Sequence, residues 1–280
     1  MKKNVLFALV AAFVAIQHDS AAQTPLLYYN FESNVPGTLT NGTVIDNLLG
    51  ADGTYRTGTL GGTGSIFNGG LVSGGDLGRS LQLTPLADAN TNLEAPNINT
   101  NFTATALSIG TANPYTAMAW VRFANQTGDN MVFGQAQAVA DQAVLHLGSR
   151  LNQYWDGHWA DDINSGTTLT QPNTWHHVAF TNTAAGTQTI YVDGVVRGTG
   201  PGDNAGGPTV GQMVQTLNVV IGTAGNAGSF SGAVDEVKIY NQVLTQAQIQ
   251  QAAVIPEPTS IVLLAASGLA LMLRRRRPQA

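Results

Sequence analysis

The feature that most limits what this chain can form is an alternation of side chains with a period of two. Successive residues of a β-strand point to opposite faces of a sheet, so this alternation predicts half-buried strands. The clearest case runs from Tyr115 to Phe123. We expect one face of this strand in the core, namely Tyr115, Ala117, Ala119, Val121 and Phe123, and the other to carry Thr116, Met118, Trp120 and Arg122.

Turn-forming residues separate further segments of this kind. Strands are predicted at Trp175 to Phe180, at Thr189 to Val192 and at Val195 to Arg197. The last two flank Asp193-Gly194, a dipeptide that favours a two-residue hairpin because both positions tolerate positive φ. The pattern returns at 217–222 and 233–240, and the 32 glycines and 10% charged residues agree with short strands and tight turns. We therefore predict one all-β domain.

A single helix signal lies near the end of this domain. Thr245 can cap the first turn of a helix running through Ile249, and Gln248 stands at the position from which its side chain can reach back. This spacing is the capping-box arrangement. One short helix is expected to close the domain.

Charge and cysteine content limit the partners and the sources of stability. The segment 23–253 holds six basic and 15 acidic residues, a net charge of −9. Such a charge repels a phosphate backbone, so nucleic acid is not expected as a partner. The chain has no cysteine, so stability must come from core packing, helped at most by a bound ion.

The first 22 residues have the pattern of a secretory signal peptide. Lys2 and Lys3 precede the apolar run Val5 to Ile16, and Ser20-Ala21-Ala22 offers the small residues that a signal peptidase requires. We predict a signal helix within 1–22, cleavage before Gln23 and export of the protein.

The last residues, 254–280, form a second targeting segment. Pro256, Glu257 and Pro258 precede the apolar run Ile261 to Leu273, which ends in Arg274, Arg275, Arg276 and Arg277. This order resembles the PEP-CTERM sorting signal of Gram-negative bacteria, which implies processing by an exosortase-type enzyme. As a hydrophobic helix, 259–273 would span only about 22 Å of a bilayer core of about 30 Å.

The arginines should hold the C-terminus in the cytoplasm, with the β domain outside the inner membrane. The membrane anchor is then transient or permanent, and the final location is the cell surface or extracellular matrix. An ordinary tail anchor that is never cleaved is the alternative for this segment.

Two stretches of the domain are the most specific: Trp175 to Ala179 with Ile190 to Gly194, and Phe230 to Asn241 followed by Leu244-Thr245. They resemble the laminin-G-like, concanavalin A-like jelly rolls. Weaker matches stand at 27–31 and 115–121, and the resemblance covers about 25–252. It implies a two-sheet antiparallel jelly-roll sandwich over 23–253, with the opening and closing strands paired. Because this fold serves lectins, adhesins, hydrolases and spacers alike, function must be argued from the site.

The sequence does not favour an enzyme. Some relatives of this fold cleave polysaccharides with two carboxylates about 5 Å apart, placed on one strand face. The only glutamates are Glu32, Glu94, Glu236 and Glu257, and Asp235 beside Glu236 would point to the opposite face. No Gly-x-Ser-x-Gly motif or cysteine nucleophile is present. A glycoside hydrolase is the least favoured alternative, since distant loops can also bring carboxylates together.

The candidate ligand site is a short segment rich in aromatic, imidazole and carboxylate groups. Aromatic rings stack on the apolar faces of a pyranose, and polar groups bond to its hydroxyls. The carbohydrate-binding candidates are Tyr154, Trp155, Asp156, His158, Trp159, Asp161 and Asp162. Alternatively, the two tryptophans are core residues and the last two aspartates form a turn.

Metal binding has less support. His176 and His177 are neighbours on a predicted strand and face opposite ways, so we expect packing or hydrogen bonding rather than a shared ion. Asp235 is predicted to share an inward face with Ala233, Val237 and Ile239, where a structural calcium, or backbone and hydroxyl donors, would satisfy it. The pairs at 129–130 and 203–204 are ordinary turn formers. No other cofactor is expected.

Two functional hypotheses follow. The first is an exported, non-catalytic lectin-like module that binds a glycan or exopolysaccharide through the 154–162 segment. The second is a structural matrix protein without a small ligand. Solvent exposure distinguishes them, because binding requires Trp155 or Trp159 to be solvent-accessible in a groove, whereas a purely structural protein should bury both.

Overall fold

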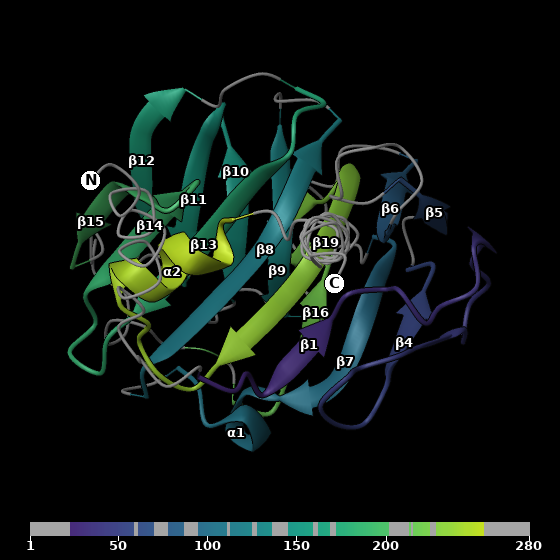
Figure 1. Cartoon of the computed structure of the whole chain (residues 1–280), viewed down its shortest axis with the longest axis horizontal. Coiled ribbons are helices and arrows are strands. Elements are labelled where there is room, and N and C mark those ends of the chain that lie inside the picture. Colours follow the sequence, from purple (N-terminus) through teal and green to yellow (C-terminus); the bar gives the residue numbers. More distant parts are fainter. Residues whose placement is uncertain are drawn as a thin grey trace, which may run out of the picture.

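A computed structural model describes residues 23–58, 61–69, 78–86, 95–110, 113–124, 128–135, 145–158, 162–168, 172–201, 213, 215–224 and 228–254. Within these residues the protein consists of two large antiparallel β-sheets stacked face to face (Figure 1). The predicted all-β jelly-roll sandwich is therefore confirmed. The predicted signal helix and the C-terminal helix lie outside the described residues.

The first sheet has nine strands among the described residues, and the helix α2 lies on its outer face (Figure 1). Its order is β15-β14-β13-β8-β19-β6-β5-β2, with β1 paired to β19. The bounds are β1 Leu27–Tyr29, β2 Gly37–Thr38, β5 Gly62–Asn68, β6 Arg79–Pro85, β8 Tyr115–Phe123, β13 His176–Asn182, β14 Gln188–Val192, β15 Val195–Gly200 and β19 Gly232–Tyr240.

The second sheet has eight strands in the described part, in the order β12-β11-β10-β9-β16-β7-β4-β3. The bounds are β3 Val44–Ile45, β4 Gly53–Arg56, β7 Asn97–Thr103, β9 Asp129–Gln135, β10 His146–Arg150, β11 Gln153–Gly157, β12 Ile163–Thr168 and β16 Asn218–Ile221. A small pair, β17 Thr223–Ala224 with β18 Gly228–Ser229, packs against β9. The asparagine and aspartate at 129–130 thus begin a strand, whereas the sequence suggested a turn.

The core lies between the sheets and is built from the alternating residues of both. On β8, the five residues predicted to face inward all belong to the main buried cluster, while Met118 belongs to a second cluster outside the sheet. Large aromatic rings fill much of this core, including Tyr29, Phe133 and Phe180. Burying a side chain of this size stabilises the fold by about 1.5–3 kcal/mol.

The first and last strands pair, as the family resemblance implied. Leu27 lies opposite Ile239 and Tyr29 opposite Val237. β19 pairs through residues 232–234 with β6 and through 237–239 with β1, so it changes partner along its length.

A β-bulge marks this change of partner and corrects the prediction for Asp235. The register between β19 and β8 shifts between Asp235 and Lys238, and Glu236 has a φ of 52°. One residue is thereby added to the strand, which reverses the alternation beyond it. Val237 therefore faces the core, but Asp235 lies on the opposite, outer face, where it is 3% exposed. The predicted inward placement of Asp235 with Val237 and Ile239 was wrong.

The locally encoded features of the C-terminal half are confirmed. Asp193 and Gly194 both have positive φ, at 51° and 74°, and connect β14 to β15. Thr245 caps α2, Gln246–Ala252, and its side chain and that of Gln248 bond reciprocally to the helix start. The sequence did not predict α1, Ala104–Leu107, a single turn capped by Thr103.

α2 packs on the outer face of the nine-stranded sheet. Its Ile249 is fully buried and forms part of a second, smaller hydrophobic cluster with Met118 and Ala179 of that sheet. Among the described residues, no helix is both long and apolar enough to cross a membrane.

Candidate functional site

The strand β11 divides the predicted ligand-binding segment between the two faces of the eight-stranded sheet. Tyr154 belongs to the buried core, and Asp156 and His158 are 0% and 1% exposed. Trp155 points the other way, toward the outer face, and is partly exposed. Trp159 and Asp161 lie outside the described residues. The predicted constellation is therefore not one continuous surface.

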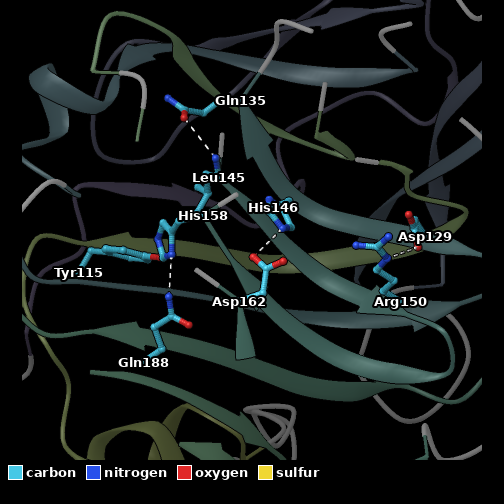
Figure 2. A network of polar contacts seen from close by, with 9 residues as sticks. All are labelled: Tyr115, Asp129, Gln135, Leu145, His146, Arg150, His158, Asp162 and Gln188. Carbon is cyan, nitrogen blue, oxygen red and sulfur yellow. Dashed lines mark hydrogen bonds and ion pairs between the residues drawn. The ribbon is translucent and has the colours of Figure 1, made fainter. Parts of the chain in front are cut away.

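Among the inward residues, His158 is the centre of a polar network (Figure 2). His158 lies between Tyr115 of β8 and Gln188 of β14, with its Nε2 2.6 Å from the Tyr115 hydroxyl and its Nδ1 3.0 Å from the Gln188 amide nitrogen. An amide nitrogen can only donate, so Nδ1 accepts and the ring proton lies on Nε2. These bonds join the two sheets through their interior.

Burial also fixes the charge state of His158. Burial, the largest cause, together with the nearby His146 lowers the pKa of the imidazole to about 3, although Asp162 acts in the opposite direction. His158 is thus neutral at physiological pH. Burial favours the structural interpretation for Tyr154, Asp156 and His158, because a polysaccharide does not reach the space between the sheets.

The outer face of β11 presents a different set of groups. Trp155 lies opposite Gly148 of β10, and the Arg150 guanidinium stands 5.4 Å from the centre of the Trp155 ring. Arg150 in turn lies opposite Asp129 of β9, with Nε 3.4 Å from Oδ1. The Arg150 side chain is 41% exposed and that of Asp129 13%.

An ion pair continues this row of outward-facing groups. His146 Nε2 lies 3.1 Å from Asp162 Oδ1. A dashed line marks this pair in Figure 2. Burial raises the pKa of Asp162, but the hydrogen bond and charge of His146 and a hydrogen bond from Trp155 outweigh it, so the pKa lies below its usual value. Asp162 is therefore a carboxylate. We call Asp129, Arg150, Trp155, His146 and Asp162 the outer strip.

Gly157 makes room for the ion pair of the outer strip. It lies opposite His146, and a Cβ at this position would approach both His146 Nε2 and Asp162 Oδ1 to less than 3.0 Å. Any larger residue would have to displace one of the two side chains. A strand glycine often marks such a close approach.

The sequence did not identify three members of the outer strip. Asp129, His146 and Arg150 stand on β9 and β10, and nothing in their local sequence distinguishes them. They join Trp155 through the strand register, which pairs β10 with both β9 and β11. The one usable signal in the sequence was the alternation within 154–158. It would have placed Trp155 on the opposite face of the sheet from Tyr154 and Asp156.

His176 and His177 behave as expected for neighbouring residues of a structural strand. His176 Nδ1 lies 2.8 Å from Asp193 Oδ2, while His177 is buried and packs edge-on against Trp120 with ring centres 5.6 Å apart. Burial, together with the charge of Lys238, lowers the pKa of His177 to about 4. The two rings thus contact different partners, Asp193 for His176 and Trp120 for His177.

In the described part of the chain no group of three or more His, Cys, Asp or Glu residues could hold a metal ion. Asp235, the predicted calcium candidate, accepts a hydrogen bond from the Glu236 backbone at 2.7 Å through Oδ1. The pair at 203–204 lies outside the described residues.

Comparison with known proteins agrees with this architecture. Two stacked antiparallel sheets with paired terminal strands define the jelly-roll class that includes lectins and glucanases. The chain belongs to the concanavalin A-like lectin/glucanases superfamily, whose family model matches residues 95–250, more than half of the sequence. No curated protein shows a significant sequence match.

Solved structures with similar folds come from varied proteins. The binding domain of Paraclostridial Mosquitocidal Protein 1 is 13% identical with a TM-score of 0.52, and the match covers 82% of this chain and 51% of that one. Trypanosoma rangeli sialidase in complex with 2,3-difluorosialic acid is 16% identical with a TM-score of 0.50, covering 83% of this chain and 33% of the sialidase.

Domain 4 of an extracellular arabinanase from Geobacillus stearothermophilus, in complex with arabinotriose, is 19% identical with a TM-score of 0.46; the match covers 82% of this chain and 98% of that domain. The chain thus spans about a third of the sialidase and half of the binding domain of the mosquitocidal protein. At these identities the likeness concerns the fold alone.

Proposed function

We propose that this is an exported protein whose jelly-roll domain binds carbohydrate without catalysing a reaction, and that the outer strip contacts the glycan. The observation that supports this most directly is the position of Trp155. Trp155 is partly exposed on the outside of the eight-stranded sheet, where it is flanked by Arg150 and by Asp162. A purely structural role predicted that this ring would be buried.

The outer strip contains the kinds of group that sugars require. An indole ring offers an apolar face for stacking. A guanidinium carries five N–H donors, and a carboxylate can accept about four hydrogen bonds, which are the two kinds of group that sugar hydroxyls bind. Membership of a superfamily that contains lectins is consistent with such a role.

The direct test is a binding assay on the purified protein against an array of glycans and insoluble polysaccharides. The variants Trp155→Ala and Arg150→Ala are expected to weaken binding by about 10-fold or more, as for anchor residues of an interface. Phe67→Ala is the matched control, because this aromatic residue is 50% exposed but stands on β5 of the other sheet. It should leave the affinity unchanged.

Three further outcomes separate the alternatives. Absence of binding to every glycan would contradict the proposal and favour a structural matrix protein. Release of reducing sugars during incubation would show a hydrolase instead. Loss of binding in the presence of a chelator would show that binding depends on a structural calcium ion, wherever in the chain the ligands of that ion lie.

The same proposal includes the route of the protein. Lys2, Lys3 and the apolar run after them support export, and Pro256 to Pro258 with the arginines at 274–277 support sorting through an exosortase-type enzyme. With a tag at each end of the domain, immunoblots of cell fractions should show loss of the C-terminal tag from the surface form. Retention of both tags in the inner membrane would indicate a permanent anchor.

A further inference from the structure

We propose that the outer strip selects an uncharged glycan, recognised through neighbouring hydroxyl groups, and discriminates against uronic-acid and sulfated polymers. This inference rests on the proposed carbohydrate-binding function and narrows its ligand class. Three features of the molecule support it: the charge of the strip, the charge of the whole domain, and the mixture of donors and acceptors that the strip presents.

The strip has no excess of positive charge. Its one guanidinium, Arg150, is balanced by Asp129 at 3.4 Å. Asp162 adds a second carboxylate, whose lowered pKa keeps it ionised. Even when His146 carries a proton, the positive and negative charges only cancel. An anionic sugar would therefore meet two carboxylates without a surplus cation to neutralise it.

The surrounding domain increases this repulsion. Residues 23–253 have a net charge of −9. Charges on a protein surface act on a ligand over about one Debye length, about 8 Å at physiological ionic strength. A polyanion, which brings many charges within this distance at once, is opposed along its length, whereas an uncharged polymer is not affected.

The polar groups of the strip suit hydroxyls better than anions. A hydroxyl both donates and accepts, so two hydroxyls on adjacent sugar carbons can donate to a carboxylate and accept from a guanidinium together. The exposed Arg150 supplies donors, and Asp129 and Asp162 supply acceptors on either side of Trp155. A carboxylate or sulfate group on the ligand has no proton for the two aspartates.

The test compares polysaccharides that share a backbone and differ in charge. Hydroxyethyl cellulose with carboxymethyl cellulose, and dextran with dextran sulfate, are two such pairs. With the full chain in affinity electrophoresis, at least one neutral member is expected to bind about 10-fold or more tightly than its charged partner. Because no counterions are released, this binding should change less than about 2-fold when the salt is raised.

Charge variants provide the second arm. Asp129→Asn leaves the size of the side chain unchanged. It should reduce the ratio of the affinities for the neutral and the charged member of a pair by about 3-fold or more. Asp162→Asn should change this ratio in the same direction. If Asp162→Asn fails to fold, as judged by circular dichroism, Asp129→Asn still decides the question.

Two results would overturn the inference, and they are distinguishable. Preferential binding of the charged members, weakened by salt and lost in Arg150→Gln, would show an anionic ligand and leave the proposed carbohydrate-binding function standing. If neither member of any pair binds, nor any glycan on the array, the proposed function itself fails, and the inference fails with it.

Discussion

Buried histidines should make the stability of this protein depend on pH in a defined window. Burial lowers the pKa of His158 to about 3 and that of His177 to about 4. In an unfolded chain both would titrate near about 6.5. Below that value the unfolded state binds more protons than the folded state, so the free energy of unfolding falls as the pH falls.

The magnitude follows from these values. Between about pH 7.5 and about pH 5, each of the two histidines should lower the free energy of unfolding by about 2 kcal/mol, so that the wild type loses about 4 kcal/mol. The pKa values of Asp162 and Asp193 are also lowered, from 3.8. Their contribution is present above about pH 4 and is lost only below it, outside this window.

The assay is urea unfolding at the two pH values, with the wild type, His158→Gln and Tyr115→Phe. The glutamine variant should lose only about 2 kcal/mol between the two conditions, because one titrating group has been removed. Tyr115→Phe is the control: it removes the hydroxyl bonded to His158 and should cost about 1–3 kcal/mol at neutral pH, yet it keeps the histidine and hence the pH dependence. The reasoning would be refuted if the wild type were equally stable at both pH values. It would also be refuted if His158→Gln lost as much free energy of unfolding between the two pH values as the wild type does.

Two other substitutions test the site and the closing helix. Gly157→Ala should destabilise the protein by about 1–3 kcal/mol and separate His146 from Asp162, since the added Cβ would overlap both side chains. Gly200→Ala is the control, because its Cβ would meet only Ile163 at 3.5 Å and should change the thermal midpoint little. Equal midpoints for the two would argue against the crowding at Gly157. Thr245→Ala removes the cap of α2 and should cost about 1 kcal/mol in urea unfolding, whereas Thr245→Ser should retain most of the stability, and an equal loss in both would contradict the capping role.

Features set by neighbouring residues could be predicted from the sequence. The inward face of β8 is an alternation over nine residues, the β14–β15 turn needs only a dipeptide that accepts positive φ, and the start of α2 needs only Thr245 and Gln248. In each case the sequence itself contains the physical cause, and long-range contacts agree with it. α1 was missed because one helical turn has too few residues to show a period.

The face of Asp235 could not be predicted, because the cause lies outside the strand. β19 bulges where it exchanges β6 for β1. Glu236 then adopts positive φ although it is not glycine, and its carboxylate is bonded by the Tyr28 hydroxyl at 2.8 Å and by Lys238 Nζ at 2.6 Å. Lys238 is two residues away on the same strand, but Tyr28 comes from β1, more than 200 residues earlier in the sequence, and a local pattern gives no indication of it.

The candidate site was predicted only in part for a related reason. Composition drew attention to residues 154–162, but the alternation of β11 places half of the described ones inside the sandwich. Trp155 remains on the surface, and its companions Arg150 and Asp129 come from β10 and β9 through the register. A binding surface on a sheet is made across strands, whereas a sequence motif runs along one.

Gly157 is also relevant to the role proposed for the outer strip. Glycine inside a strand weakens it, because it contributes no side chain and loses more backbone freedom on folding. At this position the missing side chain leaves space for His146 and Asp162, whose contact is largely buried, with His146 3% exposed. A largely buried ion pair is weak evidence of stabilisation, since apolar residues of similar volume often serve as well or better. The glycine and the ion pair beside Trp155 are therefore consistent with the proposed role of the outer strip in binding a ligand, in which they would position Asp162 beside Trp155.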